Sequence, residues 1–522
     1  MALPGWPCCC LLLLVFSPIC EAHGFAQRYD LPVPLWLYLS GAAATVAVSF
    51  IVIALFVRRG AELHRYPRLN LLKLPLIRWL AVPVVALIVR GFSVAILCLV
   101  LAAGWWGVQE PFSNIVPTTV WVIWWVGLAY LSGLAGNLWA LLNPWNNLYL
   151  AFEWLLARRR AGCDRSVLLR LPNWIGVWPA VILFLAFAWL ELVWGNSDRP
   201  HSIATAVFGY SLLTWLGMGL FGREVWLRQG EVFSLLFGVL ARFSLTEVRV
   251  TNRGLCASCD APGCRELDGD CVDCMDCFRH AAATEREWNL RPWGIGLLTA
   301  RPVSFSLLCF VVLMLATVTF DGLLATPLWA EIVQWALYSE QVRPLLLLLQ
   351  PFFSDAISVI SSVGMVLFAL LFVLVFLLFS LMMKWAVGGT TGIDVRSIAG
   401  SFVLTLVPIA LAYHLAHYLS YLLIVGQYMI PLVSDPFGYG WDLFGTKLYF
   451  VDIGIVNARF IWITSVIVIV VGHIFSVFLA HVMALRLFKT SRLVLLSQIP
   501  MLLLMVGYTM ISLWILAQPI VE

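Results

Sequence analysis

Residues 356–384 read AISVISSVGMVLFALLFVLVFLLFSLMMK, and no charged residue occurs in this stretch before Lys384. Its 29 residues exceed the roughly 20 apolar residues that cross the hydrocarbon core of a bilayer as a helix. Lipid offers no hydrogen-bond partner to backbone N–H and C=O groups, so such a run must be helical there. The stretch therefore predicts a transmembrane helix.

Comparable apolar stretches recur along the whole chain. Of its 522 residues, 62% are hydrophobic and 11% charged, whereas soluble domains carry about 25% charged residues. The 25 tryptophans suit membrane interfaces, and a net charge of +4 is too small and scattered for a nucleic-acid-binding protein. The sequence predicts an all-α, polytopic transmembrane helix bundle of about ten spans, in contact with membrane lipid. The expected spans are 34–56, 85–106, 120–142, 174–194, 203–221, 303–324, 356–384, 397–425, 460–485 and 493–517.

The N-terminus has the features of a signal peptide. CCCLLLLVFSPI at 8–19 is an apolar core of suitable length, and Cys20-Glu21-Ala22 fits a cleavage site. The expected organisation follows from this and from the spans. It is a signal peptide at 1–22, spans one to five at 23–222, a cytoplasmic cysteine-rich loop at 223–302 and spans six to ten at 303–522.

Arginine residues concentrate in the loops on one side of the predicted bundle, and ten of them lie in the loop at 223–302. By the positive-inside rule this side is cytoplasmic, which leaves both termini outside. Two loop segments carry further expectations. The amphipathic stretch 230–243 is expected to lie on the membrane surface, and the Gly- and aromatic-rich segment 434–445 is expected to fold back as a lid over the outer mouth.

Six cysteines lie close together in the predicted cytoplasmic loop. Cysteines separated by two residues can turn both thiolates toward one tetrahedral ion or one cluster iron. Disulfides are rare in a reducing compartment. The spacing therefore predicts zinc, as a structural ion that orders the loop, or an iron–sulfur cluster; unligated cysteines are the alternative. The candidate ligands are Cys256, Cys259, Cys264, Cys271, Cys274 and Cys277.

Histidines occur inside the eighth and ninth predicted spans. His414 and His417 are three residues apart and so share one helix face. His473 falls at a similar expected depth, whereas His481 lies eight residues further along its helix. Ionisable residues at membrane depth usually face the bundle interior or a cavity. We therefore expect His414, His417 and His473 to hold a metal ion or a haem iron; hydrogen bonding between helices is the alternative.

Acidic residues near the outer side fall into two groups. Asp435 and Asp442 lie in the expected lid, where they can support the imidazoles as second-layer partners. Glu191 and Asp321 lie at the outer ends of the fourth and sixth spans and are expected to be interface residues.

Several segments together are similar to a known family. The chain resembles polytopic bacterial membrane proteins commonly labelled fenitrothion hydrolase, over nearly its whole length. This resemblance implies a location in the inner membrane and hydrolysis of an organophosphorus ester, and it leaves room for a partner subunit. It implies no set of catalytic residues. The segments are 23–38, 136–145, 189–193, 221–224, 319–322, 414–418 and 434–445.

Three functions remain open at this point. The first is a metal-dependent hydrolase of apolar organophosphorus esters, in which a Lewis acid would polarise the P=O bond and activate a water. The second is a membrane redox or metal-handling protein, with haem or copper at the imidazoles. The third is a transporter or assembly factor. No Gly-x-Ser-x-Gly, P-loop or His-Glu-x-x-His motif is present to favour a soluble-type enzyme.

Overall fold

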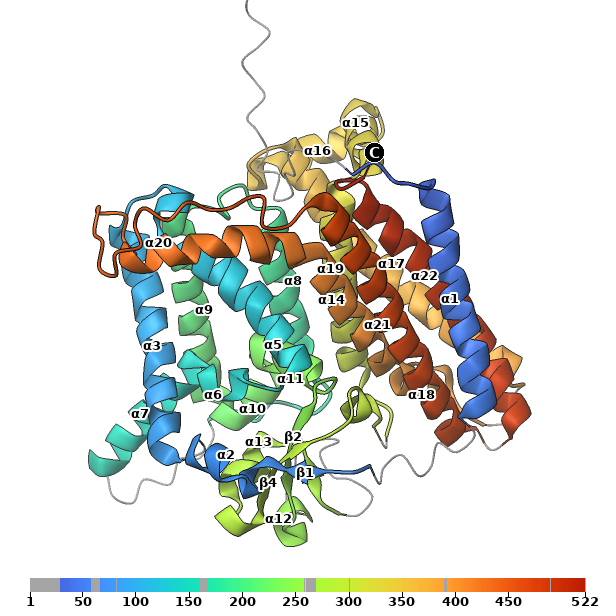
Figure 1. The fold of residues 1–522 in the computed structure, drawn as a ribbon, viewed down its shortest axis with the longest axis horizontal. Coiled ribbons are helices and arrows are strands. Elements are labelled where there is room, and N and C mark those ends of the chain that lie inside the picture. Colours follow the sequence, from blue (N-terminus) through green and yellow to red (C-terminus); the bar gives the residue numbers. More distant parts are fainter. Residues whose placement is uncertain are drawn as a thin grey trace, which may run out of the picture.

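The computed structural model describes residues 29–57, 66–80, 82–159, 168–257, 259, 269–299, 301–388, 392–488 and 490–521. The predicted signal peptide and Cys264 lie outside these residues. The described residues form a bundle of long helices, with a small β-sheet at one end and the C-terminus at the other (Figure 1). We refer to these as the sheet end and the C-terminal end. The all-α transmembrane fold is thereby confirmed.

In the described part of the chain, nine helices are long and apolar enough to cross a bilayer, and each overlaps one predicted span. The tenth predicted span, 174–194, corresponds to α8 (Trp178–Leu192), which has only 15 residues. At about 1.5 Å per residue, such a helix is shorter than the roughly 30 Å hydrocarbon core. The nine are α1 (Leu35–Phe56), α3 (Pro83–Trp106), α4 to α5 (Ile115–Leu134), α9 (Pro200–Phe221), α14 (Phe305–Leu324), α17 (Ala356–Ala386), α18 to α20 (Val395–Ser434), α21 (Ala458–Leu487) and α22 (Ser491–Ala517).

Shorter helices connect these spans. Their bounds are α2 (Pro75–Leu80), α6 (Trp139–Leu142), α7 (Pro144–Arg159), α10 (Arg223–Gln229), α15 (Pro327–Tyr338) and α16 (Arg343–Leu349). The single span Val395–Ser434 consists of five consecutive helical segments. They are α18 (Val395–Phe402), η9 (Val403–Leu406), α19 (Val407–Ile424), η10 (Val425–Tyr428) and α20 (Met429–Ser434).

The third span ends earlier than the predicted 120–142. It contains a π-helix, η4 (Thr118–Gly127), and stops at Leu134. Gly136 follows with a φ of 150°, where a Cβ would lie 2.1 Å from the Thr246 hydroxyl oxygen. That hydroxyl donates to the carbonyl of Ala135 at 2.6 Å. The helix therefore ends where Thr246, the first residue of strand β2 (Thr246–Val250), contacts it.

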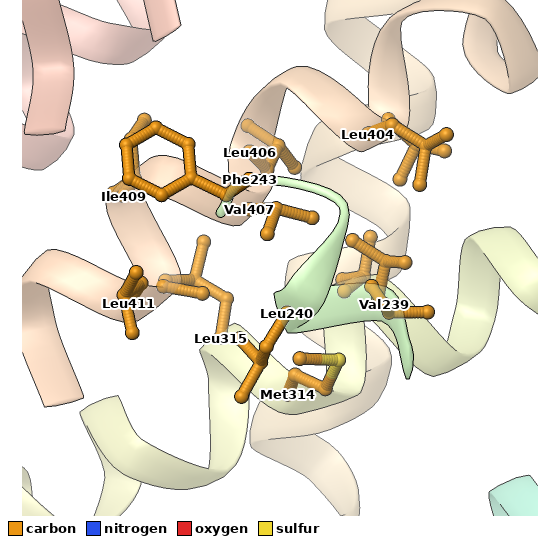
Figure 2. Packing of buried hydrophobic residues seen from close by; sticks show 14 of the residues in the cluster. Val239, Leu240, Phe243, Met314, Leu315, Leu404, Leu406, Val407, Ile409 and Leu411 are labelled. Carbon is orange, nitrogen blue, oxygen red and sulfur yellow. The ribbon is translucent and has the colours of Figure 1, made fainter. Parts of the chain in front are cut away.

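The prediction that residues 230–243 lie on the membrane surface was wrong. These residues form α11 (Val232–Ala241), which is inserted into the bundle instead of lying on its surface. Figure 2 shows its residues Val239 and Leu240 packed among side chains of α14, η9 and α19. A helix that is apolar on all sides is stable only when it is buried all round. Its buried side chains are Val232, Phe233, Leu236, Phe237, Val239, Leu240 and Ala241.

The cysteine-rich segment is a folded module and not an extended loop. Its strands are β1 (Leu69–Asn70), β2 (Thr246–Val250), β3 (Cys271–Val272) and β4 (Arg286–Leu290), in the antiparallel order β1-β4-β2-β3. Two short helices, α12 (Arg253–Ala257) and α13 (Met275–His280), complete it. We call the described residues of 244–291 together with 66–70 the module. It caps the sheet end of the bundle (Figure 1).

A buried ion network holds the module together. The Arg291 and Glu247 side chains are both fully buried, 3.4 Å apart between Nη1 and Oε2. Arg291 also contacts Asp273 at 2.7 Å, and Glu247 accepts from Arg68 Nε at 2.7 Å and from the Tyr66 hydroxyl. Burial lowers the pKa of Arg291, but Asp273 and Glu247 outweigh it and raise the pKa above its ordinary value. The guanidinium therefore stays charged in the interior and ties β4 to β2.

Helices α19 and α21 approach each other closely at Gly472. A Cβ at this position would lie 2.4 Å from the Ala412 Cβ and 2.9 Å from the Pro408 carbonyl oxygen. We expect Gly472→Ala to destabilise the bundle by about 1–3 kcal/mol, because overpacking forces the backbones apart. Thermal unfolding in detergent measures this. The control is Gly507→Ala in α22, where a Cβ would meet nothing within 4 Å; an equal loss in both variants would contradict the prediction.

Candidate functional site

Five of the six predicted cysteine ligands lie together in the module. The sulfurs of Cys256, Cys271 and Cys277 lie within 4.8 Å of one another, and so do those of Cys259, Cys274 and Cys277. The sixth predicted ligand, Cys264, lies outside the described residues. In the described part of the chain, these two groups are the clusters of three or more His, Cys, Asp or Glu side chains with metal-site spacing.

Local structure accounts for this convergence. Val250 of β2 pairs with Cys271 of β3. The turn between Cys271 and Cys274 places Asp273 at φ 54°, a left-handed conformation that Asp tolerates better than most residues. The backbone N–H of Asp273 donates to the Val248 carbonyl at 2.8 Å, and its carboxylate accepts from Arg291. The buried arginine thus holds the turn that points two thiols inward.

The cysteine thiols are protected from water. Cys256, Cys271 and Cys277 are at most 3% exposed. Burial, reinforced by the neighbouring Cys271, raises the pKa of Cys256 to about 12, and burial together with neighbouring thiols also raises the pKa of Cys277. Only thiolates bind metal ions, so an ion bound here must displace protons, and its affinity falls as the pH falls.

The thiol spacing matches one of the two predicted metal classes well. Around a tetrahedral zinc with bonds of about 2.3 Å, neighbouring sulfurs lie about 3.8 Å apart. The contacts between Cys277 and Cys271, 3.4 Å, and between Cys259 and Cys274, 3.8 Å, are of this size. A four-iron cluster binds each thiolate through a different iron and so needs wider spacing. The donors present fit a single-ion or thiolate-bridged site.

Inside the bundle, His417 belongs to a hydrogen-bonded chain of four side chains. Its Nε2 lies 2.8 Å from Asp321 Oδ2 of α14. The same oxygen accepts from the Tyr418 hydroxyl at 2.5 Å, and that hydroxyl lies 3.4 Å from Glu191 Oε1 of α8. The Tyr418 hydroxyl thus lies between two carboxylates and is closer to that of Asp321. Helices α8, α14 and α19 meet at this chain.

Glu191 and Asp321, which the sequence suggested as interface residues, are therefore members of a polar site within the helices. Their positions in predicted spans were the available signal, because ionisable groups at membrane depth usually pair with one another. What the sequence lacked was the partner. Tyr418 and His417 are separated from Asp321 by about a hundred residues of chain.

His414 lies next to this chain in an aromatic cage. Its ring centroid is 5.6 Å from that of Trp125, 5.5 Å from Tyr130 and 4.8 Å from Tyr418. Trp125 belongs to the π-helix η4, and such segments often occur at functional sites. The buried Nε2 of His414 has no hydrogen-bond partner among the described residues.

Two small cavities flank the polar chain. The first, of about 40 Å³, is lined by Glu191, His414 and Tyr418, and by Leu240 of α11. The second, of about 10 Å³, is lined by His417 together with residues near the C-terminal end. A water needs roughly 10–15 Å³ measured in this way. The first cavity has room for a few waters and the second for about one.

The described imidazoles do not converge as predicted. His414, His417 and His473 are not among the clusters with metal-site spacing in the described part of the chain. His473 Nδ1 lies 2.8 Å from the Ile469 carbonyl of its own helix, and its ring faces Tyr508 of α22 at 6.0 Å between centroids. His481 bonds to Gln498 instead. The three-imidazole site stays a prediction that this arrangement does not favour.

The two aspartates of the predicted lid, Asp435 and Asp442, accept hydrogen bonds from backbone N–H groups of their own loop. Asp435 accepts from the backbone N–H groups of Tyr439 at 2.9 Å and Gly440 at 2.6 Å. Asp442 accepts from the backbone N–H of Lys447 at 3.1 Å. No described hydrogen bond joins either aspartate to a histidine. The carboxylates shape the turns of segment 434–447, which lies at the C-terminal end of the bundle (Figure 1).

Comparison with family models, with curated proteins and with solved structures finds no match to this chain.

Proposed function

We propose that this protein is a metal-handling membrane protein, which binds a thiophilic ion such as zinc or copper(I) in the module. One observation carries the proposal: five thiols from β3, α12, α13 and the adjoining turns are gathered in a small protein interior. Soft thiolate ligands select such ions. The concentration of arginine in the loop at 223–302 supports a cytoplasmic position for the module.

The metal would also hold the module in its fold. The sheet contains two strands of only two residues, β1 and β3, and so few backbone hydrogen bonds. A small domain without a large apolar core commonly depends on a metal ion for its stability. The ion would link α12, β3 and α13 through their thiolates.

Metal analysis tests this proposal. Detergent-purified protein is expected to contain stoichiometric zinc or copper, and Cys271→Ser together with Cys274→Ser should remove most of it. The same variant should lower the thermal unfolding midpoint of the module more than that of the bundle. Cys98→Ser is the control, because Cys98 lies exposed on α3, far along the chain from the other thiols. Metal-free wild-type protein that also fails to bind added metal would refute the proposal.

A second function is favoured by the chain from Glu191 to His417. We propose that this chain transfers protons between the two cavities that flank it. Carboxylate, hydroxyl and imidazole groups can pass a proton along successive hydrogen bonds, and such chains form proton relays in membrane proteins. Liposomes containing the protein should take up protons under an imposed potential faster than protein-free liposomes.

Ester hydrolysis, which the family resemblance implies, stays a prediction. A metal-dependent mechanism needs a Lewis acid beside the substrate. The described imidazoles offer no set of three converging ligands, so the geometry supports metal binding at the module better than metal catalysis in the membrane.

A further inference from the structure

The two groups of thiols in the module share one member. Cys277 belongs both to the group with Cys256 and Cys271 and to the group with Cys259 and Cys274. It projects from α13, immediately after the turn that carries Cys274. Its side chain is 3% exposed, and its sulfur lies within 4.8 Å of both sulfurs of each of the two other pairs.

A single ion cannot use all five sulfurs. A tetrahedral zinc takes four ligands, and copper(I) bound by thiolates takes fewer. A thiolate sulfur keeps lone pairs after it has bound one ion, so it can bind a second. The arrangement of two groups around a common sulfur is the one that a bridged pair of ions requires.

We propose that the module binds two thiophilic d10 ions, zinc(II) or copper(I), with the Cys277 sulfur bridging them. One ion is held by Cys256, Cys271 and Cys277, and the other by Cys259, Cys274 and Cys277. Three sulfurs complete a trigonal copper(I) site, whereas zinc adds a fourth ligand. The inference rests on the proposed metal binding and extends it from one ion to a coupled pair.

Charge balance favours two ions over one in this interior. With zinc, five ionised thiolates and two ions leave a net charge of −1, whereas one ion leaves −3 or retains protonated thiols. Unpaired charge is costly to bury. Binding of the second ion therefore removes charge that the first ion leaves uncompensated.

Stoichiometry is the first test. Metal-depleted full-length protein in detergent, offered zinc(II) or, under reducing anaerobic conditions, copper(I), should bind two ions per chain by elemental analysis. Cys256→Ser and Cys259→Ser should each reduce the number from two to one, and Cys98→Ser should leave two. Saturation of the wild-type protein at one ion overturns the paired site but leaves the proposed function standing. Binding of no ion refutes both.

Cobalt(II) tests the bridge itself. Two cobalt ions joined by one thiolate are magnetically coupled, so the paramagnetic resonance signal should rise with the first equivalent and fall with the second. Two independent ions would double the signal instead, and that result would overturn the role of Cys277. The four thiols that remain in Cys277→Ser can surround one tetrahedral ion, so we expect this variant to bind one ion and to show no fall at the second equivalent. The Cys256→Ser variant, which keeps one complete group, provides the reference spectrum for a single ion.

Discussion

Arg291→Met is expected to unfold the module and to abolish the metal binding proposed for it. The Arg291 side chain is fully buried and donates to the carbonyls of Ser244 at 3.2 Å and Ala241 at 3.0 Å, as well as to two carboxylates. Methionine fills a similar volume but leaves Glu247 with one charged partner fewer and those carbonyls unsatisfied. Removing one partner of a buried pair costs about 3–5 kcal/mol. That loss is comparable with the whole stability of many small domains, which begins at about 5 kcal/mol.

Amide hydrogen exchange and metal analysis measure this effect. Protection should fall in β2 and β4, and the metal content should fall with it, because Arg291 also holds Asp273 in the turn between Cys271 and Cys274. Arg253→Met is the matched control. Its side chain is 74% exposed and lies 3.8 Å from Asp270, and exposed ion pairs contribute only about 0–1 kcal/mol. Equal losses in the two variants would show that the buried network is not what stabilises the module.

Asp321→Asn is expected to stop proton transfer through the bundle. The amide keeps the size of the carboxylate but cannot take up and release a proton at physiological pH. Among the four hydrogen-bonded side chains, all in the described residues, Asp321 is the one that contacts both Tyr418 and His417. Loss of a positioned proton acceptor commonly costs about 100-fold or more in rate. The measurement is proton uptake into liposomes, followed with a pH-sensitive dye trapped inside.

Two tyrosines of α19 provide a matched pair for the same assay. Tyr418→Phe removes the hydroxyl that lies between Glu191 and Asp321. Tyr413→Phe removes a hydroxyl that is buried without a hydrogen-bond partner among the described residues. We expect the first variant to lose proton flux and the second to retain it. If Tyr418→Phe conducted as well as the wild-type protein, the relay would have to be abandoned.

Hydropathy was sufficient to predict the nine long apolar helices of the described residues. The transfer of an apolar residue from water into lipid depends on that residue alone, so the long runs at 83–106 or 356–386 can be recognised without knowing their neighbours. The segment 230–243 was interpreted as amphipathic, but α11 within it is as apolar as a span. Apolarity indicates that a helix is buried, but it does not distinguish lipid from the interior of the bundle.

Short-range spacing was also informative for the cysteines. The spacing located the segment, and five of the six predicted ligands do lie together, but Cys256 and Cys259 fall in different groups, as do Cys271 and Cys274. The sequence could not predict that Cys277 belongs to both groups. It depends on the pairing of β2 with β3 and on the ion network that fixes the intervening turn.

Residue types and chain positions thus established that lipid surrounds most of this protein and that thiol ligands are concentrated in one segment. The partners of the buried polar groups were settled by folding. Asp321 meets His417, and Glu191 meets Tyr418, because α8, α14 and α19 pack against one another. His473 was placed against α22 instead, away from the other imidazoles. Which side chains become partners depends on how each helix is rotated about its axis and on which helices lie beside it. The order of residues along one helix carries little information about either.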